Sequence, residues 1–295
     1  MNGNERGFLL LTSQLGDPDR KVLTVPQFRT LANRMISMKK PKESRELTRE
    51  DLTALGYDPQ GADRIVELLA ETFRLDWYLN RGNRAGCIPI TRASDNYPLA
   101  VRKRLGLDAP GCLWAKGDLS LLDTQMVSLV GSRELKEFNY AFAEAVGREV
   151  ARQGFTLVSG NARGADKTAQ EACLRNGGKV ISVVADELEK APDDKDVLYL
   201  SEDSFDLPFS IQRAISRNRV IHGLGYITLV AQSGLKTGGT WDGTVKNLRY
   251  NWSPVFCYAD GSPAAEELEQ LGATLISLEQ LADLSALQSN IQSLI

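Results

Sequence analysis

The sequence predicts an α/β protein with a Rossmann-like parallel sheet covered by helices on both faces, preceded by a small helical N-terminal domain. From Gln125 onward, short apolar or β-branched runs alternate with stretches of helical periodicity. The runs are apolar throughout, which is typical of parallel strands buried on both faces. Before residue 90, amphipathic stretches with capping signals indicate helices. The predicted boundaries are 1–86 for the helical domain, 87–124 for a connector and 125–295 for the Rossmann-like domain.

The helical domain is predicted from three stretches with helical spacing of apolar residues. They are 24–38, 48–56 and 58–82. Thr24 provides a cap for the first stretch, and Thr48 with Asp51 three residues later forms a capping-box pattern for the second. The third stretch reads as one longer amphipathic helix that ends near Gly82. The connector that follows is expected to hold a short strand and a helix.

Six runs in the C-terminal part have the length and composition of buried strands. They are 125–130, 155–160, 179–185, 226–232, 254–259 and 273–277. The intervening stretches with helical spacing are 138–154, 165–178, 210–223, 241–251 and 264–272. In such sheets, ligands bind at the carboxyl ends of the strands near the topological switch point. We therefore expect the functional residues in the loops that follow these strands.

Composition and charge restrict the function. The net charge of −3 argues against a wholly basic nucleic-acid binder, but residues 211–249 carry six basic side chains against one acid. The four cysteines are scattered without a CxxC pair, so we expect free thiols and neither a zinc site nor a disulfide framework. The sequence has no signal-peptide pattern and no run of 18 apolar residues, which predicts a cytoplasmic protein with no membrane partner.

Two loops combine glycine with arginine directly after predicted strands. Loop one contributes Gly131, Ser132 and Arg133, and loop two contributes Ser159, Gly160, Arg163 and Gly164. Glycine lets a backbone approach closely, and a guanidinium matches phosphate oxygens. Loop two leads into a helix whose free N–H groups favour an anion, although Asp166 in its first turn could cap the same groups. Ordinary strand–helix turns with solvated arginines are the alternative for each loop.

Two further loops lie later in the chain. Loop three, residues 215–225, contributes Arg217, Asn218 and Arg219, and loop four, residues 231–244, contributes Lys236, Thr237 and Gly238. Loop four suits a phosphate cradle of backbone N–H groups, hydroxyls and one ammonium, while loop three has a solvated basic helix face as its alternative. Trp241 either stacks on a base or, as we expect, packs in the core. His222, the single histidine, is predicted to be a packed or surface residue.

All four glycine-rich or basic loops fall where a parallel sheet would gather them at one edge. That convergence predicts an anion site for a polyphosphate or a nucleic-acid backbone. The dinucleotide pattern GxGxxG and the phosphate loop GxxxxGK[ST] are both absent. Hydride chemistry on a nicotinamide cofactor is therefore disfavoured, and we expect no cofactor and no metal.

Several segments, taken in their order along the chain, resemble the DNA-processing protein A family, also called Smf. They include "VSLVGSR", "VSGNARGADKTAQEA" and "SRNRVIHGLGYITLVAQSGLKTGGT", within a resemblance that spans roughly residues 96–259. The resemblance implies a Rossmann-like domain that binds single-stranded DNA without catalysis, protects incoming strands in natural transformation and loads a RecA-type recombinase. It also implies a homodimer, and it makes the residues of loops one to four the DNA-phosphate pocket.

The sequence departs from the family pattern at several points. Gln170 stands where the family has histidine, and the acidic segment 186–196 replaces a tyrosine–proline element. The family's SGS loop reads "TGGTWDG", and no winged-helix segment follows residue 259. The resemblance therefore identifies a short, divergent member of the family.

Two alternatives remain open at this stage. A nucleotide-binding sensor or a nucleotide N-glycosidase is compatible with the same scaffold, with Asp166 and Asp242 as the available carboxylates. A protein–protein adaptor is the other alternative, because the segment after Arg249 contains acids but no lysine or arginine. The leading hypothesis is a single-stranded DNA-binding protein of DNA uptake, recombination or DNA defence.

Overall fold

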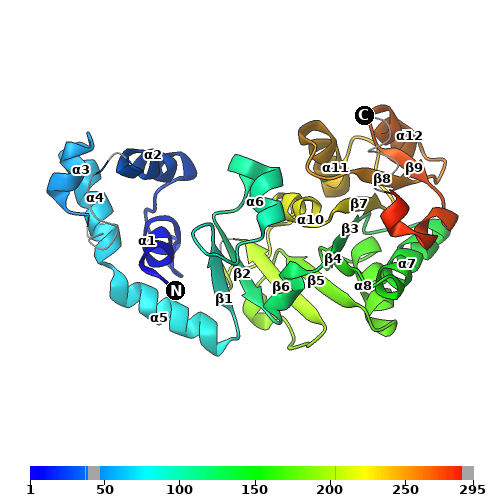
Figure 1. Cartoon of the computed structure of the whole chain (residues 1–295), viewed down its shortest axis with the longest axis horizontal. Helices are drawn as coiled ribbons and strands as arrows, with labels where there is room; N and C mark the ends of the chain where they lie inside the picture. Colours follow the sequence, from blue (N-terminus) through cyan, green and yellow to red (C-terminus); the bar gives the residue numbers. More distant parts are fainter. Residues whose placement is uncertain (37, 39–46, 203, 288–295) are drawn as a thin grey trace. The chain divides into compact units, whose positions relative to one another are not determined.

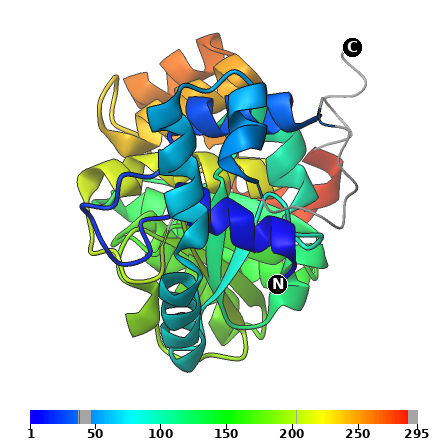
Figure 2. The same ribbon diagram turned by 90° about the vertical axis from the view of Figure 1, so that its left-hand side faces the viewer.

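The computed structural model describes residues 1–36, 38, 47–202 and 204–287. The chain forms two compact units. The first contains residues 1–97 and 111–113, and the second contains residues 98–110 and the chain from Trp114 onward. Figure 1 labels the elements of both, and Figure 2 turns the N-terminal helices toward the viewer.

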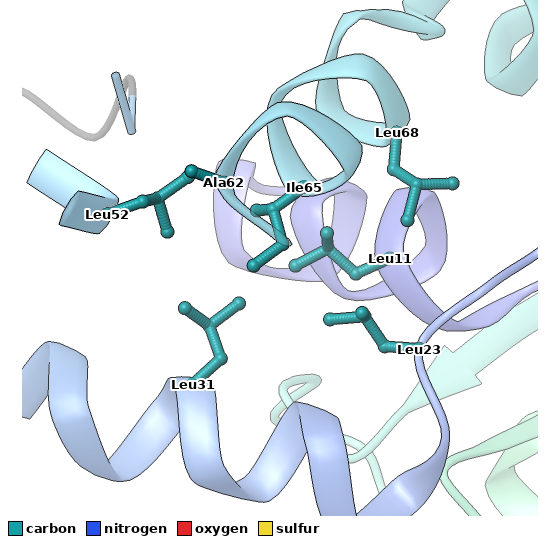
Figure 3. Close-up of a cluster of buried hydrophobic side chains, with 7 residues drawn as sticks. All are labelled: Leu11, Leu23, Leu31, Leu52, Ala62, Ile65 and Leu68. Atoms are coloured by element: carbon teal, nitrogen blue, oxygen red, sulfur yellow. The ribbon is translucent and has the colours of Figure 1, made fainter. Parts of the chain in front are cut away.

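The first unit is built mainly from helices. Its elements are α1 (Gly3–Thr12), α2 (Val25–Ile36), α3 (Arg49–Ala54), α4 (Pro59–Ala70), α5 (Thr72–Arg84) and the strand β1 (Ile88–Thr91). The predicted capping box of Thr48 and Asp51 is present at the start of α3. Helix α1 was not predicted, although Asn2 and Glu5 form a capping box at its start. Seven buried side chains from α1 to α4 and the segment between α1 and α2 form the core of these helices: Leu11, Leu23, Leu31, Leu52, Ala62, Ile65 and Leu68 (Figure 3).

The single helix predicted over residues 58–82 is wrong, because the chain leaves helical geometry at Glu71, where ψ is 38°. The reason is a tertiary contact. The buried guanidinium of Arg20 donates to the carbonyl of Leu68 at 3.4 Å and pairs with the Glu71 carboxylate at 3.1 Å. Arg20 therefore caps the end of α4 from far along the sequence, which periodicity alone does not reveal.

The second unit contains the parallel sheet. Its strands are β2 (Cys112–Lys116, shared with the first unit), β3 (Met126–Val130), β4 (Thr156–Ser159), β5 (Lys179–Val184), β6 (Val197–Glu202), β7 (Ile227–Val230), β8 (Val255–Tyr258) and β9 (Thr274–Ile276). From β6 to β9 the order is β6-β5-β4-β3-β7-β8-β9, with parallel pairing throughout. The predicted fold class and the six predicted strands are confirmed. Strand β6 was missed, and the connector holds two strands instead of one.

Helices cover both faces of this sheet. Helices α7 (Glu137–Arg152) and α8 (Ala165–Arg175) pack on one face, and α10 (Asn218–Leu224) and α11 (Gly238–Tyr250) lie on the other (Figure 1). The remaining helices of the unit are α6 (Leu99–Leu105), α9 (Ile211–Ser216) and α12 (Pro263–Gln270). The single helix predicted over 210–223 is wrong, because it divides into α9 and α10 at Arg217. The predictions of loop three as 215–225 and of loop four as 231–244 are also wrong, because α10 fills most of the first and α11 begins within the second at Gly238.

Within the described ranges, no helix combines the length and the apolar character that crossing a bilayer requires. All four cysteines are buried thiols.

Candidate nucleic-acid interface

The topological switch point lies at β3, which pairs with β4 on one side and with β7 on the other. The chain turns toward β4 after β3 and returns to β7 only after β6. Loops one, two and four follow the carboxyl ends of β3, β4 and β7, so the sheet places them next to one another.

Gln232, directly after β7, ties loop four to loop one. Its carbonyl accepts hydrogen bonds from the backbone N–H and the hydroxyl of Ser132, at 3.0 and 3.2 Å. Its side-chain amide donates to the Glu134 carbonyl at 3.1 Å and accepts from the Lys136 N–H at 3.0 Å. Gln232 was not among the predicted site residues. The feature of the sequence that could have indicated it is a polar side chain at the end of the apolar run 226–232.

Two glycines allow loops one and two to pack against each other. A Cβ at Gly131 would lie 2.4 Å from the Cβ of Ala165, at the start of α8. Gly164 has a φ of +87°, and a Cβ there would lie 2.4 Å from the Ser132 carbonyl oxygen. The Ala165 N–H also donates to that oxygen at 3.1 Å. The close approach that these glycines permit is therefore between two segments of the protein itself.

Arg217 lies beneath loop two as half of a buried ion pair. Its guanidinium donates to the Gly160 carbonyl at 3.0 Å and lies 3.7 Å from the Asp166 carboxylate. Both side chains are less than a tenth exposed, and a Cβ at Gly160 would overlap the guanidinium. Burial lowers the pKa of Arg217 and raises the pKa of Asp166, and the attraction between the two charges opposes both shifts.

The carboxylate of Asp166 faces back into loop two instead of capping its helix, and accepts from the Ala162 N–H at 3.3 Å. A pair with this geometry holds the loop in one conformation, since either charge left alone would be buried without a partner.

Arg219 pairs with Glu202 at the end of β6. The guanidinium lies 3.0 Å from the buried carboxylate, and it also donates to the backbone carbonyl and the hydroxyl of Ser216. Arg219 keeps about a quarter of its side chain exposed, at 27%. Two acid–arginine pairs thus hold the junction of α9 and α10, where loop three was predicted. The pair of Arg217 is buried and the pair of Arg219 is partly exposed.

Three predicted cations of the site reach the surface. Arg133 is exposed and forms none of the hydrogen bonds or ion pairs found among the described residues. Arg163 pairs at 3.1 Å with Glu134, with both side chains at least three-quarters exposed, and Lys236 lies 2.9 Å from Glu267. Exposed ion pairs contribute little, so an anion can replace either acid at small cost.

The N-terminus of α11 adds backbone donors to this edge. Thr237 is its N-cap but makes no side-chain capping hydrogen bond, and Gly238 has a φ of +85°. Asn218 holds the first turn in place by donating to the Gly239 carbonyl at 2.9 Å. An uncapped helix N-terminus preceded by a lysine favours negatively charged groups.

Other predicted residues lie below the surface. Ser159 is fully buried, and its hydroxyl accepts from the Gln170 amide at 2.6 Å. Gln170, where the family has histidine, also donates to Ser182 at 3.3 Å, so it links the end of β4 to the interior of β5. Trp241 is 7% exposed, which is consistent with the core role that we expected. The exposed members of the predicted site are therefore Arg133, Arg163, Lys236, Thr237 and Gly238.

His222 is completely buried, as one of the two predicted placements required. Its Nδ1 lies 3.0 Å from the Asn247 amide nitrogen and 3.3 Å from the Thr228 hydroxyl. Burial, together with the positive charge of Arg217, lowers the pKa of His222 to about 3. A histidine with this pKa stays neutral in the folded protein at neutral pH, so it does not supply a positive charge to the site.

A pH dependence of stability follows from His222. In the unfolded chain His222 takes up a proton near pH 6.5, whereas in the folded chain it does so only near pH 3. The contribution of neutral His222 to the free energy of unfolding is therefore fully present above pH 6.5 and is lost as the pH falls toward 3. We expect wild type to lose about 2 kcal/mol of unfolding free energy between about pH 8 and pH 5 relative to His222→Asn, which keeps an acceptor for Asn247. Denaturant titrations of both proteins across this range test it, and parallel curves would contradict it.

Together, the parallel sheet, the switch-point loops and the cationic, glycine-rich edge define a Rossmann-like α/β protein without the dinucleotide pattern. Residues 89–279 match the family model described as DNA recombination-mediator protein A. This match covers more than half of the chain, and the chain belongs to that family, as its resemblance to DNA-processing protein A indicated.

Curated relatives agree with this assignment, and solved structures share the fold. The DNA processing protein DprA of Streptococcus pneumoniae is 32% identical over 187 residues, which cover 59% of this chain and 66% of the relative. Its X-ray structure is similar with a TM-score of 0.67 at 24% identity, covering 88% of this chain and 96% of that one. DNA processing protein A from Helicobacter pylori, whose structure describes a single-stranded DNA binding mode, gives a TM-score of 0.56 at 24% identity and covers 70% and 95%. The chain spans between 31% and 66% of the length of the curated relatives it matches.

Proposed function

We propose that this protein binds single-stranded DNA through its phosphate backbone at the edge formed by loops one, two and four. The observation that carries the proposal is the group of exposed cations Arg133, Arg163 and Lys236 beside the uncapped N-terminus of α11. These donors recognise phosphate oxygens and read no base, so binding is largely independent of sequence and sensitive to salt. The family and the Helicobacter pylori relative support DNA as the source of the phosphates.

The buried residues of the predicted site have a positioning role in this proposal. Arg217, Asn218 and Gly160 hold loops two, three and four, while the exposed cations contact the strand. Binding without catalysis is favoured over a nucleotide N-glycosidase. Of the two carboxylates considered for that reaction, Asp166 is buried against Arg217 and cannot reach a water at the surface.

The test replaces the two exposed arginines of loops one and two. Arg133→Ala/Arg163→Ala is expected to weaken binding to oligo-dT by about 1.5–3 kcal/mol, or roughly 10- to 150-fold. The slope of log affinity against log salt should flatten by roughly 0.7 for each phosphate that the variant no longer binds. Fluorescence anisotropy of a labelled oligonucleotide at several salt concentrations measures both quantities.

Arg175→Ala is the matched control for this variant. Arg175 lies at the other end of α8 in an exposed pair with Glu144 at 2.8 Å, which resembles the pair of Arg163 with Glu134. The substitution Arg175→Ala removes one exposed arginine charge and leaves the residues of the proposed site unchanged. Equal affinities of the double variant and the control for oligo-dT would contradict the proposal.

A wider role rests on the family alone. We propose that the protein acts in the cytoplasm in DNA uptake or recombination, as a homodimer that delivers the bound strand to a RecA-type recombinase. Sedimentation of the purified chain tests the dimer. Recombinase filament formation on DNA covered by a single-strand-binding protein, with and without this chain, tests the delivery, and no acceleration would remove this role.

A further inference from the structure

Helix α5 of the first unit carries an exposed aromatic and cationic face that the loops of the sheet do not explain. Phe73 is 85% exposed and Trp77 is 54% exposed, and the two are four residues apart on the helix. Side chains at that spacing lie one above the other on the same face. Two large rings exposed side by side form an apolar patch, and such patches mark candidate binding surfaces.

This face is also hollowed and positively charged. A hollow of about 560 Å³ is lined by Phe73, Asp76, Trp77, Asn80, Arg81, Arg84 and Ala85, all from α5 or its end. The Arg6 guanidinium lies 2.7 Å from the Asp76 carboxylate, which offsets the only acid in the hollow. The stretch from Trp77 to Ser94 contains three arginines and no acid.

We propose that this face of α5, defined by Phe73, Trp77, Arg81 and Arg84, binds single-stranded nucleic acid by stacking bases on its two rings. Four residues of helix separate the rings by roughly 6 Å along the axis, so each ring can take the face of a separate base. Exposed aromatics flanked by arginines are the common means of holding unpaired bases and their phosphates. An acidic protein surface would use the charge but not two exposed ring faces at this spacing.

This inference rests on the proposed function for its ligand, but it assigns a second contact region with a different chemistry. The loops of the sheet offer phosphate donors, whereas α5 offers ring faces for bases. A stacking site gives strands with strongly stacking bases an advantage that phosphate contacts cannot provide.

The test uses the tryptophan emission of the full chain. Of its four tryptophans, Trp114, Trp241 and Trp252 are at most 7% exposed, so Trp77 is the one that a ligand can reach. Saturation with oligo-dT is expected to quench emission in wild type, and Trp77→Phe is expected to lose most of the quenching while it retains a ring. Phe73→Ala/Trp77→Ala is expected to bind oligo-dT about tenfold or more weakly. Ile36→Ala, an 83% exposed site on α2, is the control and should bind like wild type.

The outcomes separate this inference from the proposed function. If wild type binds oligo-dT with unquenched emission and the α5 double variant binds equally well, the inference is overturned and the proposed function stands. If the α5 variant weakens binding and Arg133→Ala/Arg163→Ala does not, the proposed DNA site at the loops is contradicted and the proposed site on α5 is supported. If the α5 variant turns a dimer into a monomer in sedimentation and leaves oligo-dT affinity unchanged, the face binds a second copy of the chain and the inference is wrong.

Discussion

Arg217→Ala is expected to lower the free energy of unfolding by about 3–5 kcal/mol, because it leaves the Asp166 carboxylate buried without its partner. The Gly160 carbonyl also loses its donor, so loop two no longer has a fixed position. Oligo-dT affinity should fall in the same variant, since Arg163 belongs to that loop. Urea denaturation followed by circular dichroism measures the first effect, and anisotropy under native conditions measures the second. A loss of less than about 1 kcal/mol would contradict a stabilising role of the pair.

A double variant separates positioning from direct contact. Asp166→Asn/Arg217→Met removes both charges, and it is expected to recover most of the lost stability, since no charge stays buried alone. If binding recovers too, Arg217 positions the loop. If stability recovers and binding stays weak, Arg217 contacts a phosphate directly, as the sequence hypothesis held.

Gly164→Ala is expected to cost about 2–5 kcal/mol of unfolding free energy through strain and overlap together. The added Cβ would lie 2.4 and 2.5 Å from the carbonyl oxygens of Ser132 and Arg133, which are backbone atoms that cannot rotate away. Loops one and two must then separate, which moves Arg133 away from Arg163. We therefore expect oligo-dT affinity to fall as well, in the same denaturation and anisotropy measurements.

Gly177→Ala is the matched control for this substitution. Gly177 has a φ of +73° after the end of α8, and no atom lies within 4 Å of an added Cβ. It reports the backbone strain without the overlap, so it should be less destabilising and leave DNA binding unchanged. Equal losses of stability in the two variants would show that contact between loops one and two has no energetic weight.

Local patterns predicted the sheet because each strand is a short apolar run that ends at glycine, serine or a polar residue. Strand β6 was missed because it follows an acidic segment, and its last residue is the acid Glu202. That acid is buried against the Arg219 guanidinium of α10 and the Ser216 hydroxyl. The breaks at Glu71 and Arg217 were missed for a similar reason, since each depends on a contact between residues far apart in the sequence.

By itself, the sequence determined the fold class, the family and loops one and two, since these depend on apolar periodicity and on residues close together in the chain. The sequence could not tell that Arg163 is exposed and Arg217 is buried, because their neighbours are alike in character. Arg163 precedes a glycine and Arg217 precedes an asparagine, and both lie in basic stretches. The tertiary structure leaves Arg163 at the surface and buries Arg217 beneath Gly160, 57 residues earlier in the chain. Burial depends on what packs above a side chain, and distant segments supply that packing only once the sheet has formed.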